Sequence, residues 1–255
     1  MSQPFRQIPR GWTVVAVLSL VLLTLLFTWP LVLNMRTDVI GPAHADNLEY
    51  VWKLWWVPHA IAGGGDPFFN PNVAFPTGYP MAYGEMSPVH TFLYAPVTAT
   101  FSAVTAYNLS IFASFILTGL FTYRLGLRLL GRLGFSKGLC FTGALLASFA
   151  FTFCAYRMAR ATVHLNLVDT QWLVLAFWMF DRWLERREVR IAAIFGLAVG
   201  LAGLSSWYYL FMLGLLIPVY ALAFVGWRGR RPPLLSQRGW GGGPSGAAGV
   251  GLLGV

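Results

Sequence analysis

The sequence predicts an all-α membrane protein that crosses the bilayer several times. Of its 255 residues, 57% are hydrophobic and only 11% are charged, whereas a soluble domain carries about 25% charged residues. The same composition excludes an intrinsically disordered chain, which would be poor in apolar residues. Two cysteines are too few for a small secreted domain held together by disulfides. A polytopic membrane protein is the class that remains.

Six segments approach the roughly 20 apolar residues that a helix needs to cross a bilayer. The first, 12–32, follows two arginines and ends without a cleavage site of small residues, which indicates an uncleaved signal anchor. The uncharged stretch 86–123 is expected to hold an interfacial or re-entrant helix at 89–103 and a span at 104–123. The other expected spans are 138–156, 165–180, 191–205 and 207–227.

The positive charges predict that both ends of the six-span chain lie in the cytoplasm. With the N-terminus inside, 14 of the 18 Lys and Arg residues fall on the cytoplasmic side, as the positive-inside rule requires. The net charge of +9 therefore reflects topology and does not indicate a nucleic-acid partner. All the histidines and most of the carboxylates are expected on the outer side, so the groups capable of chemistry converge there. The outer cations are Arg36, Lys53, Arg157 and Arg160.

Two regions are expected. A transmembrane domain covers 1–231 and contains a long outer loop at 34–88, with interfacial helices in it. The tail, 232–255, is rich in glycine and is expected to be disordered or to result from a truncated reading frame. In the second case the chain is an N-terminal fragment.

The outer loop carries the first candidate residues. Asp46 precedes an expected Trp-rich helix of the kind that lies at the level of the lipid headgroups, and Glu49 follows three residues later. This spacing fits a capping box. Asp46 is therefore either a helix cap or a carboxylate placed at the membrane surface as a general base. Asp46 and Glu49 could also face one metal ion, and Lys53 is expected on the wetter side of the helix.

Further along the loop, aromatic residues and prolines alternate. The rings could line a groove for a sugar or a polyprenyl chain, or they could anchor the loop at the membrane interface. Glu85 and His90 lie where the chain re-enters the membrane. Either side chain could reach a site near Asp46, and the alternative for His90 is a structural histidine.

A basic group follows the third span. Arg157, Arg160 and His164 have the spacing i, i+3, i+7, which places them on one face if the segment is helical. Guanidinium donors match the oxygens of a phosphate group, so this face is a candidate phosphate site. Snorkelling at the interface, or pairing with Asp169, would also explain cations on the outer side.

Four segments of the outer side occur in a suggestive order: TWPLVLN after the first span, DPFFNPNVAFPTG in the loop, YRMARATVHL after the third span and SSWYY in the last outer turn. Together they resemble the membrane glycosyltransferases of the GT-C class, which are similar to the polyprenyl-phosphate-mannose and arabinosyl transferases of bacteria and archaea. The resemblance covers about residues 12–231.

This resemblance implies an active site on the extracytoplasmic face of the cell membrane and a polyprenyl-phosphate sugar as the donor of a hexose or pentose. It implies a catalytic carboxylate early in the outer loop, which matches Asp46, and basic residues on the donor phosphate, which match Arg157 and Arg160. Some members use a divalent metal such as Mg²⁺ or Mn²⁺, and others use none. Members usually have more spans and often a C-terminal soluble domain, and this chain departs from that pattern.

The expected function is transfer of a sugar to a glycan, protein or lipid acceptor of the cell envelope. Asp46 would be the base, with Arg157 and Arg160 on the phosphate and Glu85, His90 and His164 completing the substrate site. One alternative is a non-enzymatic transporter or flippase component for lipid-linked sugars, which would bury ionisable groups at the middle of several spans. The other is an inactive truncated fragment.

Overall fold

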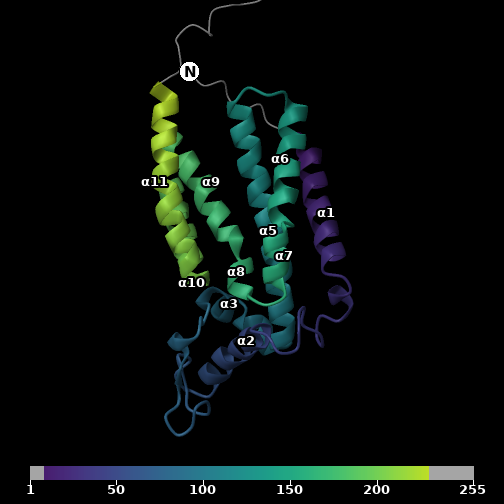
Figure 1. Cartoon of the computed structure of the whole chain (residues 1–255), viewed down its shortest axis with the longest axis vertical. Helices are drawn as coiled ribbons and strands as arrows, with labels where there is room; N and C mark the ends of the chain where they lie inside the picture. Colours follow the sequence, from purple (N-terminus) through teal and green to yellow (C-terminus); the bar gives the residue numbers. More distant parts are fainter. Residues whose placement is uncertain (1–8, 230–255) are drawn as a thin grey trace, which may run out of the picture. The chain divides into compact units, whose positions relative to one another are not determined.

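A computed structural model describes residues 9–229 and shows a largely helical chain (Figure 1). The chain divides into two units, 1–217 and 218–255. The described part of the second unit is the end of α11, so the fold below is that of the first unit.

Within the described residues, the helices begin with α1 (Arg10–Phe27), α2 (Asn47–Ala62), α3 (Pro88–Leu93), α4 (Ala95–Thr100), α5 (Ala103–Arg132) and α6 (Lys137–Thr152). They continue with α7 (Ala155–Ala161), α8 (Leu165–Val168), α9 (Thr170–Arg186), α10 (Val189–Ser205) and α11 (Trp207–Gly229). Short 3₁₀ turns occur at η1 (Leu31–Leu33) and η2 (Met81–Tyr83). Strands β1 (Phe69–Asn70) and β2 (Tyr79–Pro80) pair antiparallel in the outer loop, with Phe69 opposite Pro80.

Helix α1 has an apolar face on each side, as expected for a helix in lipid. One face is buried in the protein and repeats every four residues: Ala16, Leu20 and Thr24. The opposite face is equally apolar but exposed: Leu18, Leu22 and Leu26. In water this second face would be costly to expose, so the pattern fits a helix surrounded by acyl chains.

Helix α5 is the central element of the first unit, because α1, α2, α4, α6, α8 and α9 all pack against it. It begins where the Ser102 hydroxyl accepts a hydrogen bond from the Thr105 amide at 3.0 Å. Small residues allow the close helix packing that is common in membranes. A Cβ on Gly119 would meet the Leu20 side chain of α1, and one on Gly126 would meet Ala144 of α6.

Membrane crossing is supported by three of the described helices, α1, α5 and the Trp207–Gly226 part of α11, which are long and apolar enough. A fourth span is counted if α6 and α7, which meet at an angle of 44°, act as one. The six expected spans also need α9 and α10, which have 17 residues each. The expected tail at 232–255 lies outside the described residues.

The helix boundaries differ from the sequence prediction at several points, each with a physical cause. The helix expected at 89–103 is split into α3 and α4, with a break before Pro96. The span expected at 104–123 continues to Arg132, because Arg128 and Arg132 pair with acidic residues of α9. The span expected at 165–180 is divided at Asp169, whose side chain is held by three other residues.

Candidate functional site

The carboxylate of Asp46 does not cap α2. Asp46 occupies the N-cap position, yet its side chain makes no cap hydrogen bond, so the predicted capping box is wrong. Its Oδ2 instead lies 3.2 Å from Nε2 of His164, which follows α7. Asp46 remains 57% exposed, and a carboxylate this accessible can accept a proton from a bound molecule.

Lys53 lies on the buried side of α2, where the sequence had suggested the wetter side. Its side chain is only 2% exposed, and Nζ lies 2.6 Å from Glu49 Oε1. Nζ also donates to the backbone oxygen of Glu85 at 2.9 Å and lies 5.1 Å from the ring centre of Tyr50. A buried ammonium needs such partners. Lys53 therefore joins α2 to the segment that carries Glu85.

Glu85 is the centre of a hydrogen-bonded group drawn from three parts of the chain. Its Oε2 accepts from the amide of Asn166 in α8, and its Oε1 accepts from the Ser206 hydroxyl at 3.4 Å. Tyr50 donates its hydroxyl to Asn166 Oδ1 at 2.6 Å. Burial, and then the negative charge of Glu85, raise the pKa of Tyr50 well above its usual value. Tyr50 therefore stays protonated at neutral pH and keeps this network closed.

The last turn of α7 brings a cation to the same place. Arg160 Nη1 lies 3.4 Å from Nδ1 of His164, and its guanidinium lies 5.3 Å from the ring centre of Tyr156. Arg160 and Asp46 thus contact the same imidazole from opposite ring nitrogens. His164 links the outer loop to α7.

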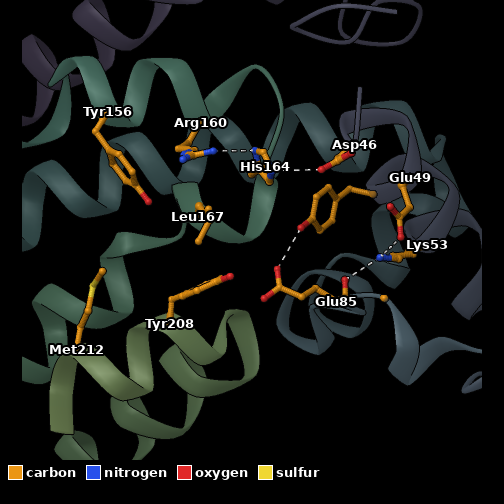
Figure 2. A pocket seen from close by; sticks show the side chains of 12 residues that line it. Asp46, Glu49, Lys53, Glu85, Tyr156, Arg160, His164, Leu167, Tyr208 and Met212 are labelled. Atoms are coloured by element: carbon orange, nitrogen blue, oxygen red, sulfur yellow. Dashed lines mark hydrogen bonds and ion pairs between the residues drawn. The ribbon is translucent and has the colours of Figure 1, made fainter. Parts of the chain in front are cut away.

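These side chains surround a hollow of about 610 Å³, which we call the outer cavity. Figure 2 shows the acidic residues and Lys53 on one side of it and Arg160 on another, with Tyr208 and Met212 of α11 across from them. Five of the residues predicted for the site line this cavity: Asp46, Glu49, Glu85, Arg160 and His164. The other lining residues are Tyr50, Lys53, Gly84, Tyr156, Leu167, Tyr208 and Met212.

Arg157 does not share the face of Arg160. Its side chain is 1% exposed and lies inside the helix packing, with the guanidinium 4.5 Å from the Phe115 ring centre. It donates to the backbone oxygens of Thr152 and Val168 at 2.8 Å and to the Ser114 hydroxyl at 3.0 Å. The prediction of a single basic face is wrong for Arg157, whose guanidinium is bound by interior oxygens. Arg160 and His164 do contact each other.

His90 also lies outside the outer cavity. Its ring is 1% exposed, and Nε2 lies 3.0 Å from Oδ2 of Asp169. The sequence offers Asp169 as a partner for the arginines, and the structure pairs it with His90. Both residues belong to the protein interior.

A family model described as "Domain of unknown function (DUF6311)" matches residues 16–251 of the chain. The chain belongs to the DUF6311 family. The match begins at Ala16, within α1, and includes every residue of the outer cavity. No curated protein matches the chain, and no solved structure matches it.

The acidic residues of this DUF6311 chain do not form a metal site. Among residues 9–229, no three His, Cys, Asp or Glu side chains are grouped so that they could hold an ion. Glu49 is paired with Lys53 and Asp46 with His164, so the two carboxylates suggested as ligands for Mg²⁺ or Mn²⁺ have separate partners. Among residues 9–229, the two carboxylates are therefore not preassembled as a metal site.

Two contacts at the cavity were not predicted from the sequence: Glu49 with Lys53, and Tyr50 with Asn166. Glu49 and Lys53 are four apart on α2, and this spacing alone could have predicted their ion pair. Tyr50 and Asn166 are 116 residues apart. No local sequence pattern predicts a contact between residues so far apart in the chain.

Gly41 holds the loop of Asp46 against the loop of His164. Its φ is +111°, and an added Cβ would lie 1.8 Å from the backbone oxygen of Thr162. We expect Gly41→Ala to lower the free energy of unfolding by at least about 2 kcal/mol, because the strained φ and the clash both act on backbone. Thermal unfolding in detergent would measure this.

The matched control is Gly64→Ala. Gly64 also has a positive φ, of +69°, but nothing lies within 4 Å of an added Cβ. Gly64→Ala should lower the free energy of unfolding only by the cost of the backbone conformation, about 1 kcal/mol. Equal losses for the two variants would contradict the close approach at Gly41.

Proposed function

We propose that this DUF6311 protein is a membrane glycosyltransferase that moves a sugar from a polyprenyl-phosphate donor to an acceptor outside the cytoplasm. The proposal rests on one observation above all. The outer cavity combines an exposed carboxylate, Asp46, with an arginine, Arg160, in a space of about 610 Å³. A volume of this order suits a small ligand, and the two charges suit the two ends of a glycosyl phosphate.

The chemistry needs a base and an anion site. An acceptor hydroxyl attacks the anomeric carbon of the donor, and its proton passes to the Asp46 carboxylate. The bond between the anomeric carbon and the phosphate oxygen breaks, and the electron pair leaves with the lipid phosphate. Arg160 stabilises the negative charge that develops there. Glu85 and Lys53 lie where they can accept from, and donate to, the hydroxyls of the sugar.

The family resemblance assigns Arg157 to the donor phosphate, whereas this proposal gives Arg157 a structural role. Its donors are directed at Ser114 and at two backbone oxygens, so it holds α7 against α5 and does not contact the donor. The phosphate is then held by Arg160, next to His164. His90 belongs to a separate group of residues.

The topology we propose has six spans, both termini in the cytoplasm and the outer cavity on the extracytoplasmic face of the cell membrane. Helices α9 and α10 complete the six. At 17 residues each they are about 26 Å long, close to the thickness of the hydrocarbon core. Cysteine labelling of the loops from either side of the membrane tests this arrangement.

The function is tested with the full chain in lipid nanodiscs and polyprenyl-phosphate donors that carry a radiolabelled hexose or pentose. Donor cleavage, with release of the lipid phosphate, supports transfer. Movement of intact donor across vesicle membranes without cleavage contradicts it and favours the transporter alternative.

We expect Arg160→Gln to raise the KM for the donor by about 10- to 100-fold, because a charge-assisted hydrogen bond to phosphate is worth about 1.5–3 kcal/mol. Steady-state kinetics with varied donor would measure the change. The matched control is Arg36→Gln, since Arg36 is also expected outside but lies over the Phe101 ring and does not line the cavity. A normal KM for Arg160→Gln would remove Arg160 from the phosphate site.

A further inference from the structure

A second hollow, of about 330 Å³, lies between the outer loop and the turn that joins α10 to α11. Ser87, Ser205 and Ser206 line it, together with the exposed rings of Phe68 and Trp207. The hollow therefore combines hydroxyl groups with apolar surface. The Ser87 hydroxyl has no role in the glycosyl transfer proposed above.

Ser87 contacts a histidine. Its Oγ lies 2.7 Å from Nδ1 of His90, at the start of α3. The same hydroxyl lies 3.0 Å from the backbone oxygen of Ser205, so its single proton has two acceptors within reach. Ser87 occupies the N-cap position of α3, yet its side chain makes no cap hydrogen bond. The hydroxyl is thus directed at the imidazole and at Ser205.

His90 in turn contacts a carboxylate. Its Nε2 lies 3.0 Å from Asp169 Oδ2, although the N–H is not aligned for a hydrogen bond. A small rotation of the ring would align it, and catalytic hydrogen bonds are often loose in the absence of ligand. A proton on Nε2 is favoured by the facing carboxylate, and it leaves the lone pair of Nδ1 toward Ser87.

Asp169 is fixed by two further donors. Gln171 donates to Oδ1 at 2.7 Å, and the Ser205 hydroxyl donates to Oδ2 at 3.0 Å. Tyr94 stacks on the His90 ring with 6.4 Å between the centres. The carboxylate and the imidazole are therefore both held in place by their neighbours, as a general base must be.

The backbone of Ser87 is unusual as well. Its φ is +48° and its ψ is +67°, in the left-handed region that residues with a side chain seldom adopt. Strain of this kind is stored where surrounding structure imposes it, often at functional positions. Here it leaves the hydroxyl beside the hollow, and alanine at this position would keep the same backbone.

We propose that Ser87, His90 and Asp169 form a catalytic triad for acyl transfer, acting on a carboxylic ester with an apolar acyl chain that enters the second hollow. This activity is separate from the glycosyl transfer proposed above and does not depend on it. The chain order Ser, His, Asp has no bearing on the chemistry, since a triad is defined by the roles and geometry of its members.

The reaction has two halves. Ser87 Oγ attacks the carbonyl carbon of the ester, and its proton passes to His90 Nδ1. The bond from that carbon to the alcohol oxygen breaks, and the departing alcohol takes the proton from His90. Water then attacks the acyl-serine and loses a proton to His90, which returns it to Ser87 as the carboxylic acid leaves. Asp169 stabilises the charged imidazole in both halves.

The substrate class follows from the walls of the hollow. Phe68 is 52% exposed, Trp207 66% and Leu204 53%, and all three line the hollow. Apolar side chains at the membrane interface favour an acyl chain that enters from the bilayer.

The test uses the full chain in nanodiscs and two serine-directed probes, diisopropyl fluorophosphate and a long-chain alkyl fluorophosphonate. We expect both to label Ser87, as located by peptide mass spectrometry, and the long-chain probe to react faster. Ser87→Ala should abolish labelling. Ser136→Ala is the matched control, because it removes a serine hydroxyl at the start of α6 that lines neither hollow, and it should leave the labelling rate of Ser87 within about twofold.

Two variants test His90 as the base and Asp169 as the group that orients it. The labelling rate of each is compared with that of the wild type once the two proteins have been shown to have equal thermal stability. His90→Asn and Asp169→Asn should each slow labelling of Ser87 by at least about 100-fold. Absence of labelling in folded wild-type protein overturns the proposal. So does labelling of another serine, or a rate that is unchanged in a folded His90 or Asp169 variant.

Discussion

Asp46→Asn is expected to reduce kcat for sugar transfer by about 10²- to 10⁴-fold, the usual contribution of a general base. Asparagine has almost the same shape as aspartate but cannot take the proton of the acceptor hydroxyl. The KM for the donor should change little, because Asp46 lies on the far side of His164 from Arg160. Steady-state transfer kinetics in nanodiscs would separate the two parameters.

The matched control for this variant is Asp38→Asn. Asp38 lies in the same outer loop and is exposed, but it does not line the outer cavity. Its variant should keep full activity. If Asp46→Asn retained wild-type kcat while Asp38→Asn did not, the base would have been assigned to the wrong carboxylate of the loop.

The sequence predicted much of the site because charge in a membrane protein is informative. All the histidines and most of the carboxylates are expected on one side, where charged groups at the membrane have to be satisfied by one another. Asp46, Glu85, Arg160 and His164 were singled out on this ground, and the structure brings all four to one cavity. Their chemical roles remain predictions.

The prediction was wrong where spacing alone was used to assign residues to one face. Arg160 and His164 do meet, although α7 stops at Ala161 and His164 lies beyond it. Arg157 lies on α7 with Arg160, but its guanidinium is bound by oxygens of the protein interior. The sequence also predicted one continuous span at 138–156, whereas α6 and α7 meet at an angle of 44°.

The buried polar groups were the least predictable part. The contacts of Asp169 with His90 and with Ser205 join residues that are 79 and 36 positions apart. In lipid such groups must find partners inside the protein. That requirement predicts that partners exist, but it does not say which ones they are.

A second large effect is expected at the other end of α5, where two arginines meet the acidic residues of α9. Asp181 is 1% exposed, and Arg132 Nη2 lies 2.6 Å from its Oδ1. Arg128 Nε contacts Oδ2 of the same carboxylate, and its Nη2 lies 2.6 Å from Glu185 Oε2. Asp181 therefore neutralises two cations at once, in a place that water scarcely reaches.

Asp181→Asn should lower the free energy of unfolding by about 3–5 kcal/mol, because it leaves the arginines with one carboxylate, that of Glu185, in a largely buried site. Unfolding of the purified protein in mixed detergent micelles would measure the loss. The control is Glu188→Gln, which removes an exposed pair with Arg186 at 3.6 Å and should cost less than about 1 kcal/mol. Similar losses for the two variants would mean that the Asp181 cluster is no more than a surface ion pair. A selective loss at Asp181 would instead show that α9 is tied to α5 through charge. This explains how a helix of 17 residues with two carboxylates and two arginines in its last turns is held beside the central span.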